Sequence, residues 1–381
     1  MTHTTDAIVV GLGAMGSAAL FHLAQRGVRV IGFDRYAPPH TLGSTHGLTR
    51  IIRESYYEHP RYVPLVQRAY ELWSDLERRA ARRLFHQTGG LMIGEESGVL
   101  VSGALRSARE HELPYELLSA RDVHRRFPGF VLPDEMSGFF EPRAGILDPE
   151  GCVEAHLALA VEAGAEIHGN ERVLEWSEKG GRVRVVTSSG DYDAGRVALC
   201  AGAWNPKLMD DETLSLRVER QVMNWFTPAR DAELFTPARC PIAMVEYATD
   251  RIFYFVPDSG DGVKAAIHHE GEVTDPDLVR REVTDEDVAP AKQMLKAFLP
   301  AAAGRHRASA TCLYTNTRDG HFLLAPHAHS PEVLIVSACS GHGFKFASAI
   351  GEAVADLLMG MPRPDLAPFG RQRDFAEQSR A

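Results

Sequence analysis

The sequence contains no run of 18 or more apolar residues, so we expect no membrane-spanning helix. It has only five cysteines among 381 residues, with no C-x-x-C pair, which argues against a disulfide framework, a zinc ribbon or a thioredoxin-like site, and we expect no metal. Its 41 basic residues are outnumbered by 51 acidic ones, which argues against nucleic acid or an anionic membrane as a partner. The N-terminal stretch MTHTTDAIVVGLG has no basic region, so we expect no signal peptide and a cytoplasmic location.

The first forty residues carry a dinucleotide-binding pattern. Its parts are a short apolar strand over 7–10, a G-x-G-x-x-G turn, a helix over 15–26 and a second strand over 28–33. In such a turn Gly11 permits the tight bend, Gly13 lets the backbone approach a pyrophosphate, and Gly16 lets the helix pack on the strand. The helix N-terminus attracts phosphates, and Asp34 ends the second strand, where an acid accepts hydrogen bonds from ribose hydroxyls. The acid argues against NADP, but the pattern leaves NAD and FAD open.

The rest of the chain predicts a mixed α/β fold with two domains. The elements predicted after the first unit are helices over 60–80 and 150–163, short strands over 172–177, 182–187 and 196–200, and a sheet-rich segment over 220–275. The stretch PEVLIVSACSGHGFKFASAIGEAVADLLMG predicts a late strand, a glycine turn and a helix that ends at Gly360. A late unit of this kind is typical of FAD proteins, because FAD is long and needs a second contact region.

We therefore predict that two parts of the chain alternate along the sequence. A Rossmann-like FAD-binding domain is expected to comprise 1–84, 147–218 and 300–381. A second, sheet-rich substrate domain is expected to comprise 85–146 and 219–299.

Five motifs occur together and in a fixed order: GLGAMG, GSTHGLTRIIR, AGAW, CLYTNT and SGHGFKF. With these motifs the chain resembles the monomeric sarcosine oxidase and N-methyltryptophan oxidase family, within the D-amino-acid-oxidase-like flavoproteins. The resemblance extends from residue 6 to about residue 360. It implies FAD as the cofactor, a small-molecule N-alkyl amino acid and O2 as reactants, and a monomeric enzyme.

The resemblance gives a role to one of the five cysteines. Taken from the residues alone, Cys312 is an ordinary buried thiol, since free cysteine usually behaves as a small hydrophobe. The resemblance implies instead that Cys312 carries FAD covalently through the 8α-methyl group of the flavin, which requires nearby positive charge to stabilise a thiolate. Cys339 is a rival attachment point, and Cys152, Cys200 and Cys240 are expected in the core.

Four basic residues are implied to bind the flavin or the substrate carboxylate. Arg50 and Arg53 are three positions apart, so they would lie on neighbouring faces if the segment were helical, and the isoleucines between them favour a partly buried segment. By resemblance Arg50 packs beside the flavin ring, and Arg53 and Lys345 bind the substrate carboxylate, for which a guanidinium fork is suited. His46 matches a family histidine near the flavin, although the family often has a second histidine where this chain has Thr45.

The resemblance also implies residues that shape the reaction site. Lys264 lies in the middle of a predicted strand and taken alone could face solvent, but the resemblance implies that it contacts flavin N5 through water and activates dioxygen. His268, Tyr254 and Tyr314 match positions that orient the amine, and the adjacent His269 could replace His268 in that match. The remaining implied cofactor contacts, beyond Gly11, Gly13, Gly16, Asp34 and Lys345, are Met15, Val173, Gly202, Trp204, Gly341, Gly343 and Phe344.

We therefore predict an FAD-dependent oxidase of secondary amino acids such as sarcosine. The predicted reaction transfers a hydride from the carbon next to nitrogen to flavin N5, the imine hydrolyses to formaldehyde and an amino acid, and O2 becomes H2O2. N-methyltryptophan, cyclic imino acids and glycated amino acids are alternative substrates. An FAD dehydrogenase with a protein electron acceptor is a second hypothesis, against which Lys264 argues, and a non-catalytic FAD- or NAD-binding module is a third.

Overall fold

The fold begins with the parallel βαβ unit that the sequence predicts. The computed structural model describes residues 3–211 and 213–372, and its first elements are β1 (His3–Val10), α1 (Ala14–Gln25) and β2 (Val30–Phe33). β1 and β2 pair in parallel, and both lie inside the molecule with their apolar residues buried. Burial on both faces is the reason why these strands are continuous apolar runs rather than alternating ones.

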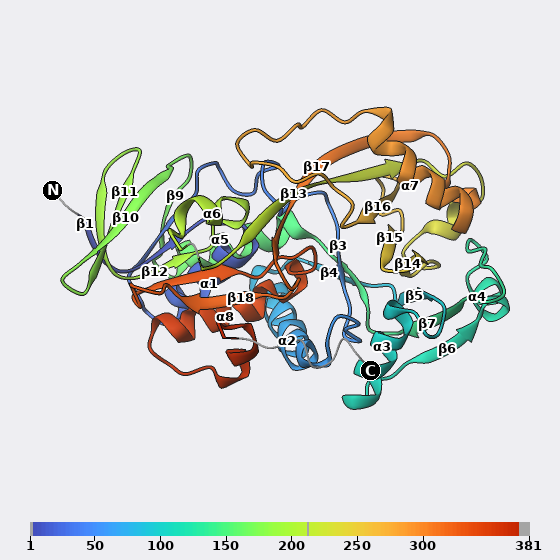
Figure 1. The fold of residues 1–381 in the computed structure, drawn as a ribbon, viewed down its shortest axis with the longest axis horizontal. Helices are drawn as coiled ribbons and strands as arrows, with labels where there is room; N and C mark the ends of the chain where they lie inside the picture. Colours follow the sequence, from blue (N-terminus) through green and yellow to red (C-terminus); the bar gives the residue numbers. More distant parts are fainter. Residues whose placement is uncertain (1–2, 212, 373–381) are drawn as a thin grey trace.

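The first sheet surrounds this unit and occupies the left half of Figure 1. Its further strands are β9 (Glu166–His168), β10 (Val173–Lys179), β11 (Arg182–Thr187), β12 (Asp191–Leu199), β18 (Leu323–Pro326) and β19 (Val333–Ser337). The strand order is β10-β11-β12-β1-β2-β9, and β19 also pairs with β12 and β18. The late strand β19 therefore joins the sheet of the N-terminal unit, as expected for the late strand–turn–helix segment.

α1 and α8 (Ala347–Leu358) lie on this sheet and pack against each other through small residues. α1 also packs against α5 (Pro149–Glu162), and α2 (Val63–Ala80) packs against α5 and α8. Gly351 of α8 lies directly against α1, where a Cβ atom on it would collide with Ala18 and with the backbone nitrogen of Ala19. The two helices can approach this closely because residue 351 has no side chain.

The second sheet occupies the right half of Figure 1 and has the order β17-β13-β16-β15-β14-β5-β7-β6. Its strands are β5 (Gly90–Gly94), β6 (Glu116–Ser119), β7 (Ser137–Glu141), β13 (Leu216–Phe226), β14 (Ile242–Ala248), β15 (Arg251–Val256), β16 (Val263–His268) and β17 (His306–Thr317). The helices that accompany it are α3 (Val99–Glu110), α4 (Ala120–Arg126) and α7 (Asp285–Phe298). This arrangement confirms the mixed α/β fold, and the sheet-rich segment 220–275 lies in the second sheet.

A third, small sheet lies between the other two and consists of β3 (Arg50–Ile52), β4 (Phe85–Gln87) and β8 (Gly145–Leu147). The short helices that complete the described residues are η1 (Pro60–Tyr62), η2 (Gly202–Trp204), α6 (Asn205–Leu208), η3 (Ala232–Phe235), η4 (Pro300–Ala302), η5 (Phe344–Phe346) and η6 (Pro364–Phe369). The Arg50–Arg53 segment is therefore extended and not helical, because β3 pairs with β8. It is partly buried, as its isoleucines indicated.

The second sheet does not coincide with the predicted substrate domain, because it includes β17. The predicted FAD-binding domain included residues 300–381, yet β17 pairs along its length with β13 in the second sheet. The exact division of the chain into domains stays a prediction. Among the described residues, no helix is both long enough and apolar enough to cross a membrane.

Two buried carboxylates join the small sheet to the second sheet. Glu141, at the end of β7, accepts the backbone N–H groups of Glu54 and Ser55 at 2.5 and 2.7 Å and so fixes the turn after Arg53. Glu54 is 1% exposed, and its Oε1 lies 2.9 Å from Nη1 of Arg143. Burial raises the pKa of Glu54 to about 7, with Arg143 opposing the rise and Glu141 adding to it.

We predict that Gly351→Ala destabilises the fold. The added methyl group forces α1 and α8 apart, and the free energy of unfolding should fall by about 1–3 kcal/mol, because overpacking outweighs the gain in helix propensity. Urea denaturation followed by circular dichroism measures the change. Gly190→Ala is the matched control, because a Cβ atom there meets nothing within 4 Å. Equal stability of the Gly351→Ala variant and the wild type would contradict the close contact.

We predict that Glu54→Gln changes how stability depends on pH. The folded chain binds this proton more tightly than the unfolded chain does, so wild-type stability falls as pH rises from about 4.5 to about 7. The variant has no carboxyl group at position 54 and so lacks this loss of stability. The difference in unfolding free energy, variant minus wild type, should therefore increase by roughly 1–2 kcal/mol between pH 5 and pH 8, after allowance for solvent screening. Thermal denaturation at several pH values measures it, with the exposed Glu135→Gln as control. Parallel profiles of wild type and Glu54→Gln would contradict the assignment.

Candidate active site

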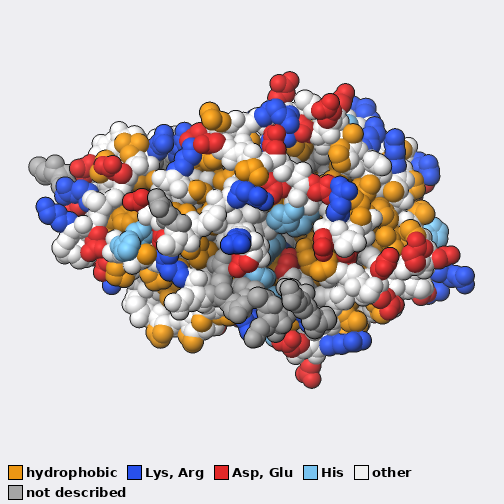
Figure 2. Space-filling view, viewed as in Figure 1, with side chains coloured by type: hydrophobic (Ala, Val, Ile, Leu, Met, Phe, Trp, Pro, Cys, Tyr) orange, Lys and Arg blue, Asp and Glu red, His pale blue; other side chains and the backbone are white. Residues whose placement is uncertain are grey.

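A single elongated cavity runs from the ends of β1 and β2 to the second sheet. Most of the predicted site residues line it: Gly11, Gly13, Met15, Asp34, Arg50, Arg53, Val173, Gly202, Trp204, Tyr254, Lys264, His268, Cys312, Tyr314, Gly341, Gly343, Phe344 and Lys345. Gly16 and His46 are not among the lining residues. Figure 2 shows histidine side chains in a hollow near the middle of one face of the molecule.

The glycine turn after β1 presents the N-terminus of α1 to the cavity. Gly11 has a φ of 89°, and a Cβ atom on it would lie 2.6 Å from the carbonyl oxygen of Cys200, so the turn requires glycine there. Gly13 is the N-cap residue of α1 and has no side chain to cap the helix, and Oγ1 of Thr45 accepts the backbone N–H of Ala14 at 3.2 Å. Gly16 packs against the turn itself, because a Cβ atom on it would collide with the Gly11 carbonyl. The absence of a side chain at Gly16 therefore lets the first turn of α1 lie directly against the turn that follows β1.

Asp34 connects the glycine turn to the end of β2. Its Oδ2 accepts the backbone N–H of Leu12 at 2.8 Å and its Oδ1 accepts that of Tyr36 at 2.9 Å. Each carboxylate oxygen has a further lone pair, so Asp34 can still accept a hydroxyl group. Val173, Gly202 and Trp204 line the same end of the cavity.

These features fit an extended dinucleotide. The N-terminus of α1 supplies partial positive charge and N–H groups for a pyrophosphate, and Asp34 supplies an acceptor for ribose hydroxyls. At the other end, the turn 341–345 lines the cavity before α8, and the N-cap residue of this helix makes no side-chain cap bond. One cavity thus joins two helix N-termini, which matches a cofactor with an anionic middle and an electron-accepting ring at its far end.

Cys312 lies on β17 beside a cation. Its Sγ is 3.7 Å from Nη2 of Arg50, and the same guanidinium nitrogen donates to the carbonyl oxygen of Ser44 at 2.7 Å. Cys339 also lines the cavity, but its Sγ accepts the backbone N–H of Thr315 at 3.3 Å, and burial raises the pKa of its thiol. Only Cys312 of the two thiols makes a described contact with Arg50. The other three cysteines are buried in the core, as expected.

Lys264 on β16 is 2% exposed and lines the cavity, so it does not face solvent. Its Nζ donates to the carbonyl oxygens of Gly47 and Thr49, both at 2.9 Å, and lies 3.3 Å from Oγ1 of Thr49. Burial lowers the pKa of Lys264 well below its ordinary value, and the Arg50 charge adds to the effect. The lysine is therefore fixed in place by the segment that precedes β3. Its contact with flavin N5 remains a prediction.

His46 is buried behind this segment. It is 2% exposed, and its Nε2 has no hydrogen-bond partner among the described residues. Burial, with the Arg50 and Lys264 charges nearby, lowers the pKa of His46 to about 3. Because this buried histidine is neutral, it adds no third positive charge beside Arg50 and Lys264.

Arg53 is paired with a carboxylate that the sequence analysis did not single out. Its Nη2 lies 2.8 and 2.7 Å from the two carboxylate oxygens of Glu58, and its Cζ lies 4.3 Å from the ring centre of Tyr56 and 4.7 Å from that of Tyr57. Burial opposes the charge of Glu58, but the Arg53 guanidinium holds the pKa of that carboxyl below its ordinary value. Nε of Arg53 has no partner among the described residues. Glu58 lies five positions after Arg53 in a polar stretch, which was the one signal for this pair in the sequence.

Three rings meet at Gly341. Its φ is 77°, and a Cβ atom on it would lie 2.7 Å from Tyr314, 2.8 Å from His269 and 2.9 Å from His268. Nδ1 of His268 lies 3.2 Å from the Tyr314 hydroxyl. Burial, with His269 beside it, lowers the pKa of His268 well below its ordinary value, so this ring is neutral. His268 lines the cavity, whereas His269 is exposed and has a φ of 61°, which separates the two candidates by position.

Lys345 lies in η5, just before α8, and is 6% exposed. Its Nζ donates to the carbonyl oxygen of His342 at 2.6 Å and to the hydroxyl of Tyr56 at 3.4 Å. Burial lowers the pKa of Lys345 to about 7, and the Arg53 charge lowers it further while Glu58 opposes the shift. Arg53 and Lys345 therefore place two basic groups beside one tyrosine ring, with Cζ of Arg53 4.3 Å and Nζ of Lys345 5.2 Å from the ring centre of Tyr56.

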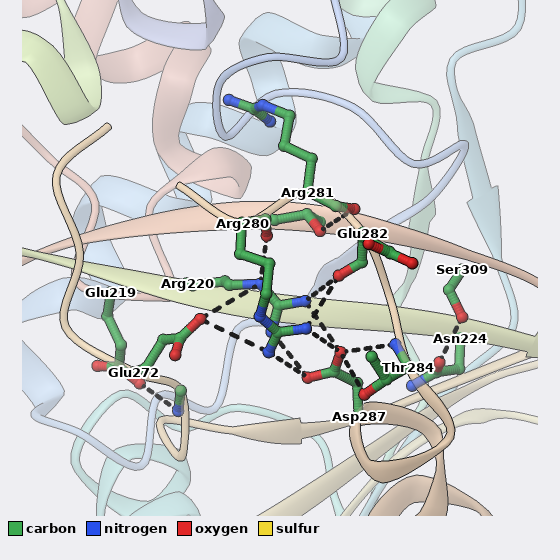
Figure 3. Close-up of polar contacts among 12 residues, drawn as sticks. Glu219, Arg220, Asn224, Glu272, Arg280, Arg281, Glu282, Thr284, Asp287 and Ser309 are labelled. Carbon is green, nitrogen blue, oxygen red and sulfur yellow. Dashed lines mark hydrogen bonds and ion pairs between the residues drawn. The ribbon is translucent and has the colours of Figure 1, made fainter. Parts of the chain in front are cut away.

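A long connection lies between β16 and α7, and we call its residues 269–284 the strap. Arg220 of β13 binds the strap through its backbone carbonyl groups. Its guanidinium donates to the carbonyl oxygens of Arg280 and Glu282 at 2.6 and 3.1 Å and pairs with Asp287 at 2.8 Å, as Figure 3 shows. The Arg281 side chain points away from this cluster and donates to the carbonyl oxygen of Leu42 at 2.7 Å.

The strap also reaches the dinucleotide end of the cavity through Asp277. This carboxylate pairs with Arg35, pairs with Lys207 at 2.6 Å and accepts the indole N–H of Trp204 at 2.8 Å. All three partners line the cavity. The sequence analysis missed the strap, because its contacts join residues as far as 242 positions apart and follow no local pattern.

Comparisons with known proteins agree with this geometry. The family model of FAD dependent oxidoreductases matches residues 6–357. Monomeric sarcosine oxidase of Streptomyces avermitilis is 42% identical over 94% of this chain and 94% of its own length. Monomeric sarcosine oxidase of Bacillus sp. strain B-0618 is 36% identical over 98% of this chain and 97% of its own. N-methyl-L-tryptophan oxidase of Yersinia pestis is 34% identical over 97% of this chain and 99% of its own.

Solved structures give the same result. NikD, an unusual amino acid oxidase essential for nikkomycin biosynthesis, matches with a TM-score of 0.85 and 27% identity over 97% of this chain and 98% of its own. Glycine oxidase from Geobacillus kaustophilus is similar in fold, with a TM-score of 0.80 at 20% identity over 98% of this chain and 100% of its own. The chain is an oxidoreductase, and it belongs to the family of FAD-dependent oxidoreductases that includes monomeric sarcosine oxidase and N-methyl-L-tryptophan oxidase.

Proposed function

We propose that the protein is an oxidase of secondary amino acids, with N-methyl amino acids such as sarcosine as its substrate class. The observation that carries the proposal is the pair of buried cations, Arg53 and Lys345, at the end of the cavity where neutral His268 lies. Two cations suit a carboxylate, and a neutral imidazole suits an amine that must be uncharged to react. The curated relatives named above as sarcosine and N-methyl-L-tryptophan oxidases support this substrate class.

The residues of this chain bind and orient the substrate. Bound FAD would accept a hydride from the carbon next to nitrogen and pass two electrons to O2, and the released imine would hydrolyse to formaldehyde and an amino acid. Arg53 and Lys345 hold the carboxylate, while His268 and Tyr314 lie next to each other and orient the amine. Lys264 provides fixed positive charge for the reaction with O2. We also propose a monomer, as the names of the sarcosine oxidase relatives state for those proteins.

We propose that Cys312 carries the flavin covalently. The contact between its Sγ and Arg50 supports this choice over Cys339, because a neighbouring guanidinium stabilises the thiolate that must attack the flavin methyl group. Arg50 would then remain beside the flavin ring after attachment. Tyr254 lines the same part of the cavity.

The substrate class is tested by a peroxide assay. The purified protein, with its bound flavin, is expected to release H2O2 and formaldehyde in equal amounts from one or more members of a panel of sarcosine, N-methyltryptophan, pipecolate, proline and a glycated amino acid. A cyclic substrate would give H2O2 without formaldehyde and would move the protein to the imino acid oxidases. Flavin reduction by the panel without H2O2 release would favour the dehydrogenase.

We predict that Cys312→Ser releases the flavin from its covalent bond. After acid precipitation, yellow colour should stay in the pellet of the wild type and appear in the supernatant of the variant. Cys339→Ser is the matched control and should behave like the wild type. The reverse pattern would assign the attachment to Cys339, and a colourless wild-type pellet with yellow supernatant would contradict covalent attachment without affecting the proposed oxidation.

We predict that Lys264→Met slows the reaction with oxygen. Loss of one fixed positive group beside the site of charge development should lower the rate constant of reduced enzyme with O2 by about 10²–10³-fold. Anaerobic flavin reduction by substrate should change little, and stopped-flow absorbance separates the two steps. Lys296→Met, on the exposed side of α7, is the control. Unchanged oxygen reactivity in Lys264→Met would remove the lysine from this role.

A further inference from the structure

A chain of polar groups extends from Lys345 through Tyr56 and His342 to the backbone of Gly320. Nζ of Lys345 lies 2.6 Å from the carbonyl oxygen of His342 and 3.4 Å from Oη of Tyr56. Oη of Tyr56 lies 2.6 Å from Nδ1 of His342, and Nε2 of His342 lies 3.0 Å from the carbonyl oxygen of Gly320. All three side chains are buried, with exposed fractions of 6%, 0% and 8% for Lys345, Tyr56 and His342.

The positions of the protons in this chain follow from its last member. The carbonyl oxygen of Gly320 can only accept, so Nε2 of His342 carries a hydrogen. Burial lowers the pKa of His342 to about 3, so the ring is neutral and its Nδ1 has a lone pair. The Tyr56 hydroxyl therefore donates to Nδ1. The lone pairs of that hydroxyl then face Lys345, and the tyrosine acts as an acceptor for the lysine.

This arrangement fixes what Lys345 can offer to a ligand. A charged lysine has three N–H groups, of which two are held by the His342 carbonyl and by Tyr56, and the third is free for the cavity. A neutral lysine has two N–H groups, which the same two acceptors hold, so that its lone pair faces the cavity. Only the charged form can then donate to a carboxylate, and the neutral form repels it.

Other charged and titratable groups face Lys345 from the neighbouring elements. Arg53, after β3, favours the neutral lysine, and Glu58, in the segment before η1, favours the charged one. His268, at the end of β16, is neutral and adds no charge. Because Arg53 and Glu58 are paired with each other, their effects on Lys345 largely cancel. Burial still lowers the pKa of Lys345, and the acceptors Tyr56 and His342 oppose it by holding two N–H groups of the charged lysine.

We propose that Tyr56 and His342 are positioning residues for the carboxylate end of the substrate: they engage two donors of Lys345, so that carboxylate binding requires the third. The proposal rests on the proposed function, because it deepens the role of Lys345 in that site. This arrangement makes the affinity of the site for a carboxylate depend on pH. Affinity should be full while Lys345 is charged and should fall as pH rises through the pKa of this lysine, near 7.

Acetate tests the proposal, because it carries the carboxylate without the amine. Its affinity for the enzyme as purified is measured by isothermal titration calorimetry from pH 5.5 to pH 9, for the wild type and for Tyr56→Phe, His342→Asn and Tyr70→Phe. For the wild type we expect acetate binding to weaken by about tenfold or more across this range, as one lysine loses its charge. Neutral acetamide, as a control ligand, should show no such dependence.

The variants separate positioning from a general structural effect. Tyr56→Phe removes one acceptor, so the charged lysine is less stable and the midpoint should move to lower pH by about half a unit to one unit. Its neutral lysine also keeps a free N–H, so acetate binding above pH 8 should fall less steeply than in the wild type. In His342→Asn the amide oxygen lies near the position of Nδ1 and can accept the Tyr56 hydroxyl in its place. The pH profile of this variant should therefore remain that of the wild type. Tyr70→Phe removes another buried hydroxyl, which donates to the backbone carbonyl oxygen of Arg143, and its pH profile should also follow that of the wild type.

The possible failures are distinguishable. A wild type that binds no acetate at pH 6 would overturn the carboxylate site itself, and with it this part of the proposed function. A pH-dependent wild type with a Tyr56→Phe profile that coincides with it would overturn the positioning role alone. A shift in Tyr70→Phe equal to that in Tyr56→Phe would also overturn it, because the effect would then belong to any lost buried hydroxyl.

Discussion

Arg53, Lys264 and Lys345 are each more than nine-tenths buried around one cavity, and a charge removed from water costs several kcal/mol unless the protein replaces its hydration. Glu58 is the only carboxylate among the described direct partners of these three side chains. Backbone carbonyl oxygens hold both lysines. Because carbonyl groups satisfy hydrogen bonds without cancelling charge, the cavity keeps a positive potential. That potential suits a cofactor that gains electrons and a substrate that carries a carboxylate.

The segment before β3 shows how backbone carbonyl groups hold a buried cation without cancelling its charge. Gly47 and Leu48 both have positive φ values, 101° and 67°. Their N–H groups donate to the Glu150 carboxylate of α5, at 2.6 Å for Gly47, while the carbonyl oxygens of Gly47 and Thr49 face Lys264. The strained residue Leu48 thus belongs to a segment that separates an anion on one side from cations on the other.

The sequence predicts those parts of the site that depend on local pattern. The G-x-G-x-x-G turn, Asp34 and the late helix after Lys345 follow from periodicity and glycine placement, and the structure confirms them as elements. The buried position of Lys264 needed the family resemblance, because a single lysine in a strand does not reveal which face it occupies. For Cys312 the residues alone indicated a buried thiol, and only its role as the flavin attachment came from the resemblance. The tautomer of His342 and the contacts of the strap depend on segments that are distant in the sequence, and the Arg53–Glu58 pair, although only five positions apart, follows no helix or strand period. No period in the sequence encodes such contacts, and the extended form of β3 came from pairing with β8 rather than from its own residues.

The strap is attached to the rest of the protein in two different ways. On the dinucleotide side its contacts are ion pairs of Asp275 and Asp277, made by side chains that are a quarter to two-fifths exposed. Such pairs contribute up to about 1 kcal/mol each. On the other side β13 holds it, because the buried Arg220 donates to two strap carbonyl oxygens and the backbone N–H of Thr274 donates to the carbonyl oxygen of Val218 at 3.0 Å. The strap is therefore anchored firmly at the second sheet and weakly at the dinucleotide end, where salt in the solvent screens its contacts.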